Sequence, residues 1–168
     1  MTSATRPVES QPIIRRVVDG DAQDLFGLLS LCFAEYPGCY VDPHDDLPDL
    51  RTPSTCFSRH DGAFWAVEDE RGRVCACVGV DFAEAGMAEL HRLYVRPDQR
   101  GNGLGSRLVA HVEAYARGRG AGRIVLWSDT RFTTAHRLYT RLGYVQAEGQ
   151  RPLGDISNSW EYGFEKAL

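Results

Sequence analysis

Two patterns are missing from this sequence: a long apolar run and a pair of cysteines spaced Cys-x-x-Cys. No apolar stretch approaches the roughly 18 residues of a membrane-spanning helix. The polar residues 1–11 lack the apolar core of a secretory signal. The five cysteines are odd in number, and no His/Cys cluster has the spacing of zinc ligands. We therefore expect reduced thiols, no metal, no membrane partner and a cytoplasmic protein.

The sequence also lacks an excess of positive charge, because the 168 residues carry a formal net charge of −4. No basic stripe interleaved with aromatic residues is present, so nucleic acid is not expected as a partner. With 43% hydrophobic residues the chain can bury a core without disulfides. We predict one domain over residues 12–168, preceded by a flexible tail over residues 1–11.

What the chain does contain is an alternation of strand and helix patterns. Strands are expected at residues 13–18, 63–68, 73–82, 89–95, 123–127, 144–146 and 158–165. Helices are expected at residues 21–36, from the glycine-rich loop to Gly118 or Gly120, and through residues 132–142. This order predicts an α/β fold, with a mixed, mostly antiparallel central sheet of about seven strands and helices on both faces.

The centre of the sequence is a strand that leads through a glycine-rich turn, residues 100–105, into a helix. The first N–H groups of a helix have no internal partners and lie at the positive end of its dipole, so this turn can hold an anion. The spacing is not that of a mononucleotide loop, because no Gly-Lys pair exists. It is not that of a dinucleotide loop either, because the sixth position from Gly101 is Ser106.

Two motifs carry a resemblance to a known family. Arg100-x-x-Gly103-x-Gly105, with Gln99 before it, resembles the coenzyme A pyrophosphate loop of the GNAT superfamily of acyl-CoA N-acyltransferases. The segment Ala-His-Arg-Leu-Tyr-Thr-Arg-Leu-Gly-Tyr, residues 135–144, is similar to the later helix of that family. The resemblance runs from about residue 13 to residue 164. It implies the GNAT fold, with acetyl-CoA as co-substrate and an amine as acceptor.

The resemblance also implies the groups that move protons. An amine arrives mostly protonated and must lose a proton before it can attack a thioester, and the departing thiolate needs a proton. Glu89 matches the general base of the family and Tyr139 matches its general acid. His91 is a rival base on the same face of the strand, unless a bulge changes the alternation. His136, one turn before Tyr139, is interpreted as a neighbour of it.

The resemblance assigns the cofactor to the backbone of the strand and the loop. The N–H and C=O groups of Leu93 and Val95 would pair with the pantetheine amides, while Arg100 and Arg107 would add positive charge near the pyrophosphate. Phe132 stands where many relatives have an asparagine that contacts the pantetheine arm. The full predicted set of cofactor-binding residues is Leu93, Tyr94, Val95, Arg100, Gly101, Asn102, Gly103, Leu104, Gly105 and Ser106.

The acceptor is expected to lie against the irregular residues 39–61. Carboxylates that could attract a cation occur there and just before: Glu35, Asp42, Asp45, Asp46 and Asp49. His44 and Arg51 could instead bind a carboxylate of the acceptor. We expect a small cationic or zwitterionic amine. A protein lysine or N-terminus as acceptor, and a non-catalytic acyl-CoA-binding module, remain open. The final strand could mediate a homodimer.

Overall fold

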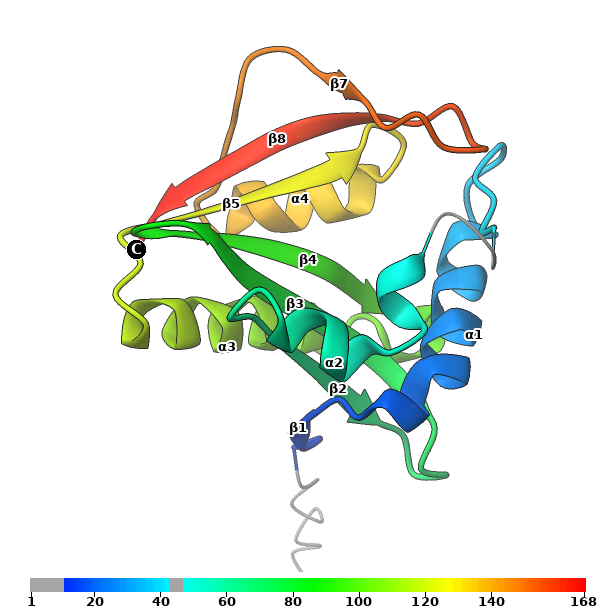
Figure 1. The fold of residues 1–168 in the computed structure, drawn as a ribbon. Helices are drawn as coiled ribbons and strands as arrows, with labels where there is room; N and C mark the ends of the chain where they lie inside the picture. The colour runs from blue at the N-terminus through cyan, green and yellow to red at the C-terminus, as the bar shows by residue number, and fades with distance from the viewer. Residues whose placement is uncertain (1–10, 43–46) are drawn as a thin grey trace, which may run out of the picture.

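The computed structural model describes residues 11–42 and 47–168 (Figure 1). The predicted flexible tail therefore lies outside the described residues, except for Gln11. The strands are β1 (Ile14–Arg16), β2 (Ala63–Glu68), β3 (Val74–Glu84), β4 (Met87–Val95), β5 (Arg123–Asp129), β6 (Val145–Gln146), β7 (Arg151–Pro152) and β8 (Trp160–Ala167). The α-helices are α1 (Ala22–Phe33), α2 (Pro53–Ser58), α3 (Leu104–Gly118) and α4 (Thr133–Arg141).

The strands form one 8-stranded sheet in the order β1-β2-β3-β4-β5-β8-β6, with β7 paired to β8. The pair β4–β5 is parallel and the other pairs are antiparallel. The parallel pair exists because α3 carries the chain from the end of β4 back to the start of β5. The predicted α/β fold with a mixed, mostly antiparallel sheet is confirmed.

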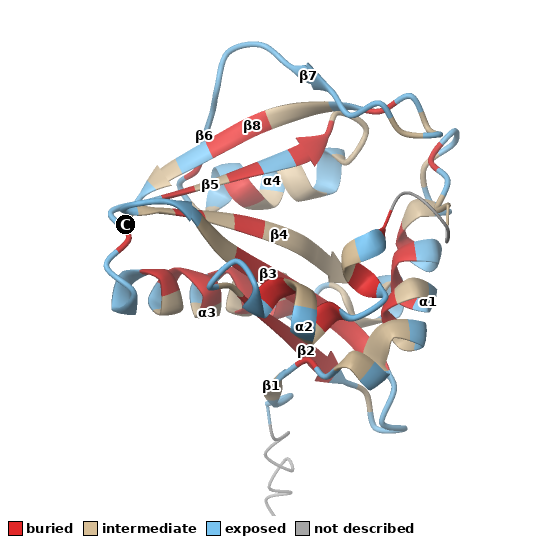
Figure 2. Ribbon diagram, in the orientation of Figure 1, coloured by how far each residue is buried: buried red, intermediate tan, exposed pale blue. Residues whose placement is uncertain are grey.

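Helices cover both faces of the sheet and bury two cores (Figure 2). The periodic apolar residues of α3 are all buried against one face of β2–β4: Leu104, Leu108, Val109, Val112 and Ala116. The apolar stripe of α1, with Leu50 and Phe57, fills the opposite face. Because both faces are covered, β2 is buried over Ala63–Val67 rather than alternating.

The most consequential feature of the sheet is an irregularity in β4. Cys77 of β3 pairs with Tyr94, while Gly79 pairs with His91, so β4 holds one extra residue between these positions. Within this bulge Arg92 has a positive φ of 53°. The pairing of β4 with β5 stops at Leu90 and Leu126, although both strands continue. The ends of β4 and β5 therefore separate.

The final strand does not form a free edge, which corrects one expectation. β8 lies between β5 on one side and β6 and β7 on the other. The short β7 was not predicted, because two residues in a polar stretch carry no periodic signal. An exposed final strand is thus not available for a dimer. None of the helices in the described ranges combines the length and apolar composition of a membrane span.

Candidate active site

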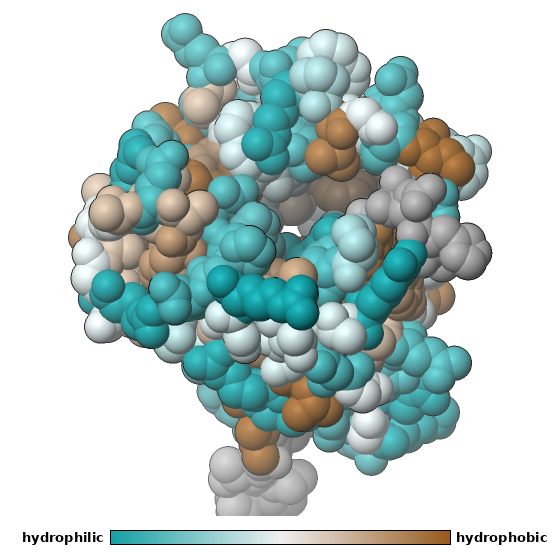
Figure 3. All heavy atoms as spheres, viewed as in Figure 1, coloured by the Kyte–Doolittle hydropathy of each residue, from teal (hydrophilic) through white to brown (hydrophobic). Residues whose placement is uncertain are grey.

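A cavity of about 610 Å³ lies where β4 and β5 separate. Residues 89–94 of β4 form one wall, residues 127–129 of β5 another, and Tyr139 of α4 also lines it. Residues 151–161, in and around β7 and the start of β8, contribute the far side. The space-filling view shows the molecule hollowed on this face (Figure 3).

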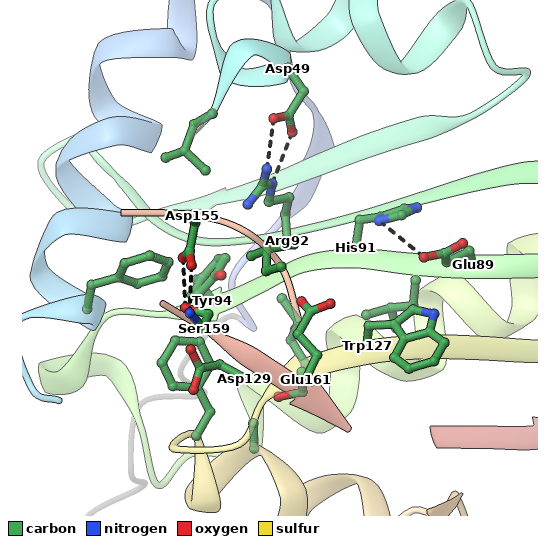
Figure 4. Close-up of a pocket in the computed structure, with 18 of the residues that line it drawn as sticks. Asp49, Glu89, His91, Arg92, Tyr94, Trp127, Asp129, Asp155, Ser159 and Glu161 are labelled. Atoms are coloured by element: carbon green, nitrogen blue, oxygen red, sulfur yellow. Dashed lines mark hydrogen bonds and ion pairs between the residues drawn. The ribbon is translucent and has the colours of Figure 1, made fainter. Parts of the chain in front are cut away.

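Glu89 and His91 lie side by side on the β4 wall (Figure 4), and Asp81 of the neighbouring β3 lies beside His91. Nε2 of His91 lies 3.0 Å from Oδ2 of Asp81, and Nδ1 of His91 lies 4.0 Å from Oε1 of Glu89. The bulge follows His91, so Glu89 and His91 keep the same face of the strand and both line the cavity. Asp81, Glu89 and His91 each offer one ligand atom within 4.8 Å of the others, so this group could also hold a metal ion.

A glycine on β3 positions the imidazole. A Cβ atom at Gly79 would lie 2.5 Å from Cε1 of Phe57, so only glycine lets that ring lie against the strand. Phe57 then meets His91 edge to face, with 6.1 Å between ring centroids. The ring of Phe57 therefore restricts the orientation of His91, and Asp81 lies beside Nε2 without a hydrogen bond to it. The sequence pattern did not identify either of them as a site residue.

Tyr139 reaches the cavity from the buried side of α4. Only 5% of the residue is exposed, and its ring packs on Tyr144 and Phe164 at centroid distances of 5.7 and 5.5 Å. Burial raises the pKa of Tyr139, so the phenol keeps its proton at neutral pH. His136 does not line the cavity; its Nε2 lies 3.0 Å from the carbonyl oxygen of Asp129. Its interpretation as a structural neighbour is therefore supported.

The glycine-rich loop leaves the N-terminus of α3 without a side-chain cap. Gly101 and Gly103 have positive φ values of 86° and 74°, which glycine adopts without strain. The first helical bond runs from the N–H of Arg107 to the carbonyl of Gly103 at 3.0 Å, so the preceding N–H groups have no partner within the helix. Gly105 also has a packing role, because a Cβ atom there would lie 3.2 Å from Cδ2 of Leu138.

Three of the groups expected near the cofactor already have partners within the described residues. The guanidinium of Arg100 pairs with Glu35 at 2.7 Å rather than standing free beside the loop. Its Nε donates to the carbonyl of Val95 at 2.8 Å, so this carbonyl is already occupied. The side chain of Arg107 likewise donates to the carbonyl of Pro12. Beyond Leu90, β4 still has no β5 partner, which leaves the stretch around Leu93 open to a ligand.

The residues of the predicted acidic acceptor surface that the structure describes do not gather at the cavity as free carboxylates. Asp49 binds Arg92 through two hydrogen bonds of 3.0 and 2.8 Å, and so ties the segment after α1 to the bulge. Glu35 is taken up by Arg100. His44, Asp45 and Asp46 lie outside the described residues. Asp42 and Arg51 do not line the cavity.

Phe132, just before α4, packs against aromatic residues at the end of α1. Its ring lies 4.8 Å from that of Tyr36 and 5.6 Å from that of Phe33, at the end of α1. Phe33 in turn packs on Tyr94 at 5.8 Å. An aromatic bridge therefore stands at the position where the resemblance places an asparagine in many relatives.

The far side of the cavity is polar and was not predicted. Asp129 binds Arg131 through two hydrogen bonds, and Asp155 accepts from the N–H and the hydroxyl of Ser159, both at 2.7 Å. Burial alone would raise the pKa of Asp129, but the bonds from Arg131 outweigh it and hold that pKa below its ordinary value. These residues join loops far apart in sequence, so no local motif could have identified them.

Comparisons with known proteins identify the family and match the fold. The family model described as "Acetyltransferase (GNAT) family" matches residues 23–144. An uncharacterized N-acetyltransferase of Schizosaccharomyces pombe is 34% identical over 101 residues; the match covers 60% of this chain and 62% of that protein, which is less than two thirds of its length. An acetyltransferase structure from Streptococcus agalactiae has a TM-score of 0.78 at 20% identity, covering 94% of this chain and 98% of that one. The PaiA N-acetyltransferase of Thermoplasma acidophilum, in complex with coenzyme A, has a TM-score of 0.72 at 16% identity, covering 95% of this chain and 100% of that one.

Proposed function

The chain belongs to the acetyltransferase (GNAT) family, and on that basis we propose that it transfers the acetyl group of acetyl-CoA to a primary amine of a small molecule. The observation that carries this proposal is the cavity between β4 and β5. It brings Glu89 and His91 on one strand to the same space as Tyr139 on α4. A family member with these groups in one cavity has the parts that direct transfer within a ternary complex requires.

We assign the cofactor to the loop and the open edge of β4. The free N–H groups of residues 101–106 would bind the pyrophosphate, supported by the dipole of the 15-residue helix α3. The stretch around Leu93 would pair with the pantetheine arm, because β4 has no neighbour there on the β5 side. This arrangement would direct the thioester toward the cavity, where the amine arrives. Coenzyme A bound to a relative of the same fold supports this assignment.

In the proposed reaction Glu89 takes a proton from the ammonium group of the acceptor. The amine nitrogen then attacks the thioester carbonyl carbon, the C–N bond forms as the C–S bond breaks, and the nitrogen releases its second proton to solvent. Tyr139 gives its proton to the leaving thiolate and regains one from solvent. Its raised pKa keeps it in the donating form. Glu89 returns its proton to solvent, so that one proton is released for each acetyl group transferred.

His91 is the second candidate for the base, and a specific contact supports it. Asp81 approaches Nε2 to 3.0 Å, so a carboxylate lies beside the imidazole and would stabilise a positive charge on the ring. In this version His91 takes the proton and Glu89, 4.0 Å from Nδ1, stabilises the resulting charge. Asp81 is then a positioning residue. The two versions differ in the pH profiles of single variants, as described below.

The proposed activity is tested by amine-dependent release of thiol from acetyl-CoA. Purified protein is incubated with acetyl-CoA and a panel of small amines, amino acids and lysine-containing peptides, and products are identified by mass. We expect thiol release with a small amine and a product heavier by one acetyl group. Acetyl-CoA binding by calorimetry without thiol release for any acceptor would instead indicate a non-catalytic binding module. Faster turnover of peptides than of small amines would indicate a protein acceptor.

A further inference from the structure

The arginines around the cavity are already neutralised. Arg92 is held by Asp49 and Arg131 by Asp129, each through two hydrogen bonds. Arg151 donates from Nε to Glu161 at 2.9 Å, and its guanidinium also lies 3.8 Å from the ring centroid of Trp127. Among the described residues, each arginine that lines this cavity, or that binds an acidic residue lining it, is therefore paired with a carboxylate.

Carboxylates remain in excess after this pairing. Asp81 and Glu89 have His91 as their only titratable neighbour within ion-pair distance among the described residues. Asp155 is bonded to Ser159, which carries no charge, and the nearby guanidinium of Arg131 is already bound to Asp129. Asp81, Glu89 and Asp155 all line the cavity. Its potential is therefore negative, which attracts cations and repels anions.

Apolar side chains lie among these charges. Trp127 and Leu153 line the cavity and remain 36% and 53% exposed. Phe33, Phe132 and Tyr94 add aromatic surface on the α1 side. Figure 3 shows hydrophobic residues beside the hollow on this face. Cavities that combine apolar walls with a few placed charges bind amphipathic ligands.

We propose that the acceptor is a cationic amine with an apolar or aromatic body and no carboxylate. This inference rests on the proposed acetyl transfer and names the class of acceptor. The ammonium group would meet Glu89, His91 and Asp81, and the body would lie against Trp127 and Leu153. A free amino acid does not fit, because its carboxylate would find no unmatched arginine in the described cavity wall and would lie among excess carboxylates.

Matched pairs of acceptors test this proposal. Each pair is an amino acid and its decarboxylated amine: tyrosine and tyramine, tryptophan and tryptamine, lysine and cadaverine. We expect kcat/KM at least about tenfold higher for the amine than for the amino acid in each pair, and higher for tyramine than for cadaverine. Tyrosine methyl ester, which has the size of the acid without its charge, should approach tyramine. Equal or better turnover of the amino acids would overturn the proposal and leave acetyl transfer standing.

A charge variant makes the test independent of substrate size. In Glu161→Gln the guanidinium of Arg151 loses its carboxylate, so the cavity gains an unmatched cation and tyrosine should improve relative to tyramine. Glu165→Gln, on the same strand but outside the cavity, is the matched control and should leave the ratio unchanged. An unchanged ratio in Glu161→Gln would contradict the proposal.

Binding separates this inference from the reaction itself. Calorimetry with the protein saturated with coenzyme A measures tyramine and tyrosine without turnover. Tighter binding of tyramine, with no thiol release in the assay, would support the acceptor class while contradicting the proposed transfer. Equal binding of both, or no binding of tyramine, would overturn the acceptor class whatever the kinetics.

Discussion

Asp81 and Glu89 are directly opposed partners on β3 and β4. Like charges directly opposite each other destabilise a sheet, so stability does not explain this pair. His91 lies between them, 3.0 Å from Asp81 and 4.0 Å from Glu89. An acidic pair with an imidazole between them, facing a cavity, is suited to receiving a proton from an ammonium group.

The identity of the base is tested by substituting these residues one at a time. Glu89→Gln should lower kcat/KM by ~10²–10⁴ and abolish the loss of activity at low pH, since a base works only when unprotonated. If Glu89→Gln still loses activity at low pH, while His91→Asn does not, the general base is His91. Asp81→Asn should then also lower kcat/KM, because the imidazolium loses the carboxylate beside it. The measurement is kcat/KM against pH for each variant.

The proton donor is tested by Tyr139→Phe. This change should lower kcat by ~10² with little effect on the affinity for acetyl-CoA, because only the leaving thiolate loses its donor. Because burial raises the pKa of Tyr139, the parent should show no fall in kcat from phenol ionisation up to about pH 10, the ordinary tyrosine value. Tyr144→Phe is the control: its hydroxyl binds Glu113 away from the cavity, so kcat should be preserved. A normal kcat in Tyr139→Phe would contradict this role.

The cofactor loop is tested by Gly103→Val. The variant places a branched side chain at the uncapped end of α3, and we expect the Kd for acetyl-CoA to rise by about tenfold or more, or ~1.4 kcal/mol. Gly86→Val is a close control, because Gly86 has the same φ of 74° and equally open surroundings but lies in the β3–β4 turn. Similar acetyl-CoA affinities in the two variants would remove the loop from the cofactor site. Calorimetry provides both constants.

Gly105→Val should act on stability rather than on the cofactor alone. Its Cβ would lie 3.2 Å from Leu138 and 3.9 Å from Val95, so the added methyl groups overpack the contact between α3 and α4. The expected loss is about 1–3 kcal/mol in the free energy of unfolding. Chemical denaturation measures it, and an unchanged midpoint would show that α4 can move away without cost.

Much of the fold follows from local patterns, because burial imposes them. The apolar residues of α3, from Leu104 to Ala116, recur at helical spacing and are all buried. The β4 wall was predicted in part: the resemblance indicated Glu89, and alternation placed His91 beside it. Asp81 could not be identified, because its place opposite Glu89 depends on the register between β3 and β4, which shifts between Asp81 and Glu84.

The charges around the acceptor show a second limit of sequence reasoning. Asp49 and Glu35 suggested a surface for cations, yet both are ion-paired to arginines distant in sequence. Which carboxylates stay unmatched depends on how every charged side chain is placed in three dimensions. The sequence and the structure both indicate a positively charged acceptor, but they assign its recognition to different carboxylates.

Two-substrate initial-rate kinetics test the central claim, direct transfer between acetyl-CoA and an amine in one cavity, most directly. Thiol release is measured while acetyl-CoA and tyramine are varied together, and the intact mass of the protein is recorded after incubation with acetyl-CoA alone. For direct transfer we expect intersecting lines in double-reciprocal plots and an unmodified protein mass. Parallel lines with a protein heavier by one acetyl group, or thiol release that does not depend on any amine, would contradict it.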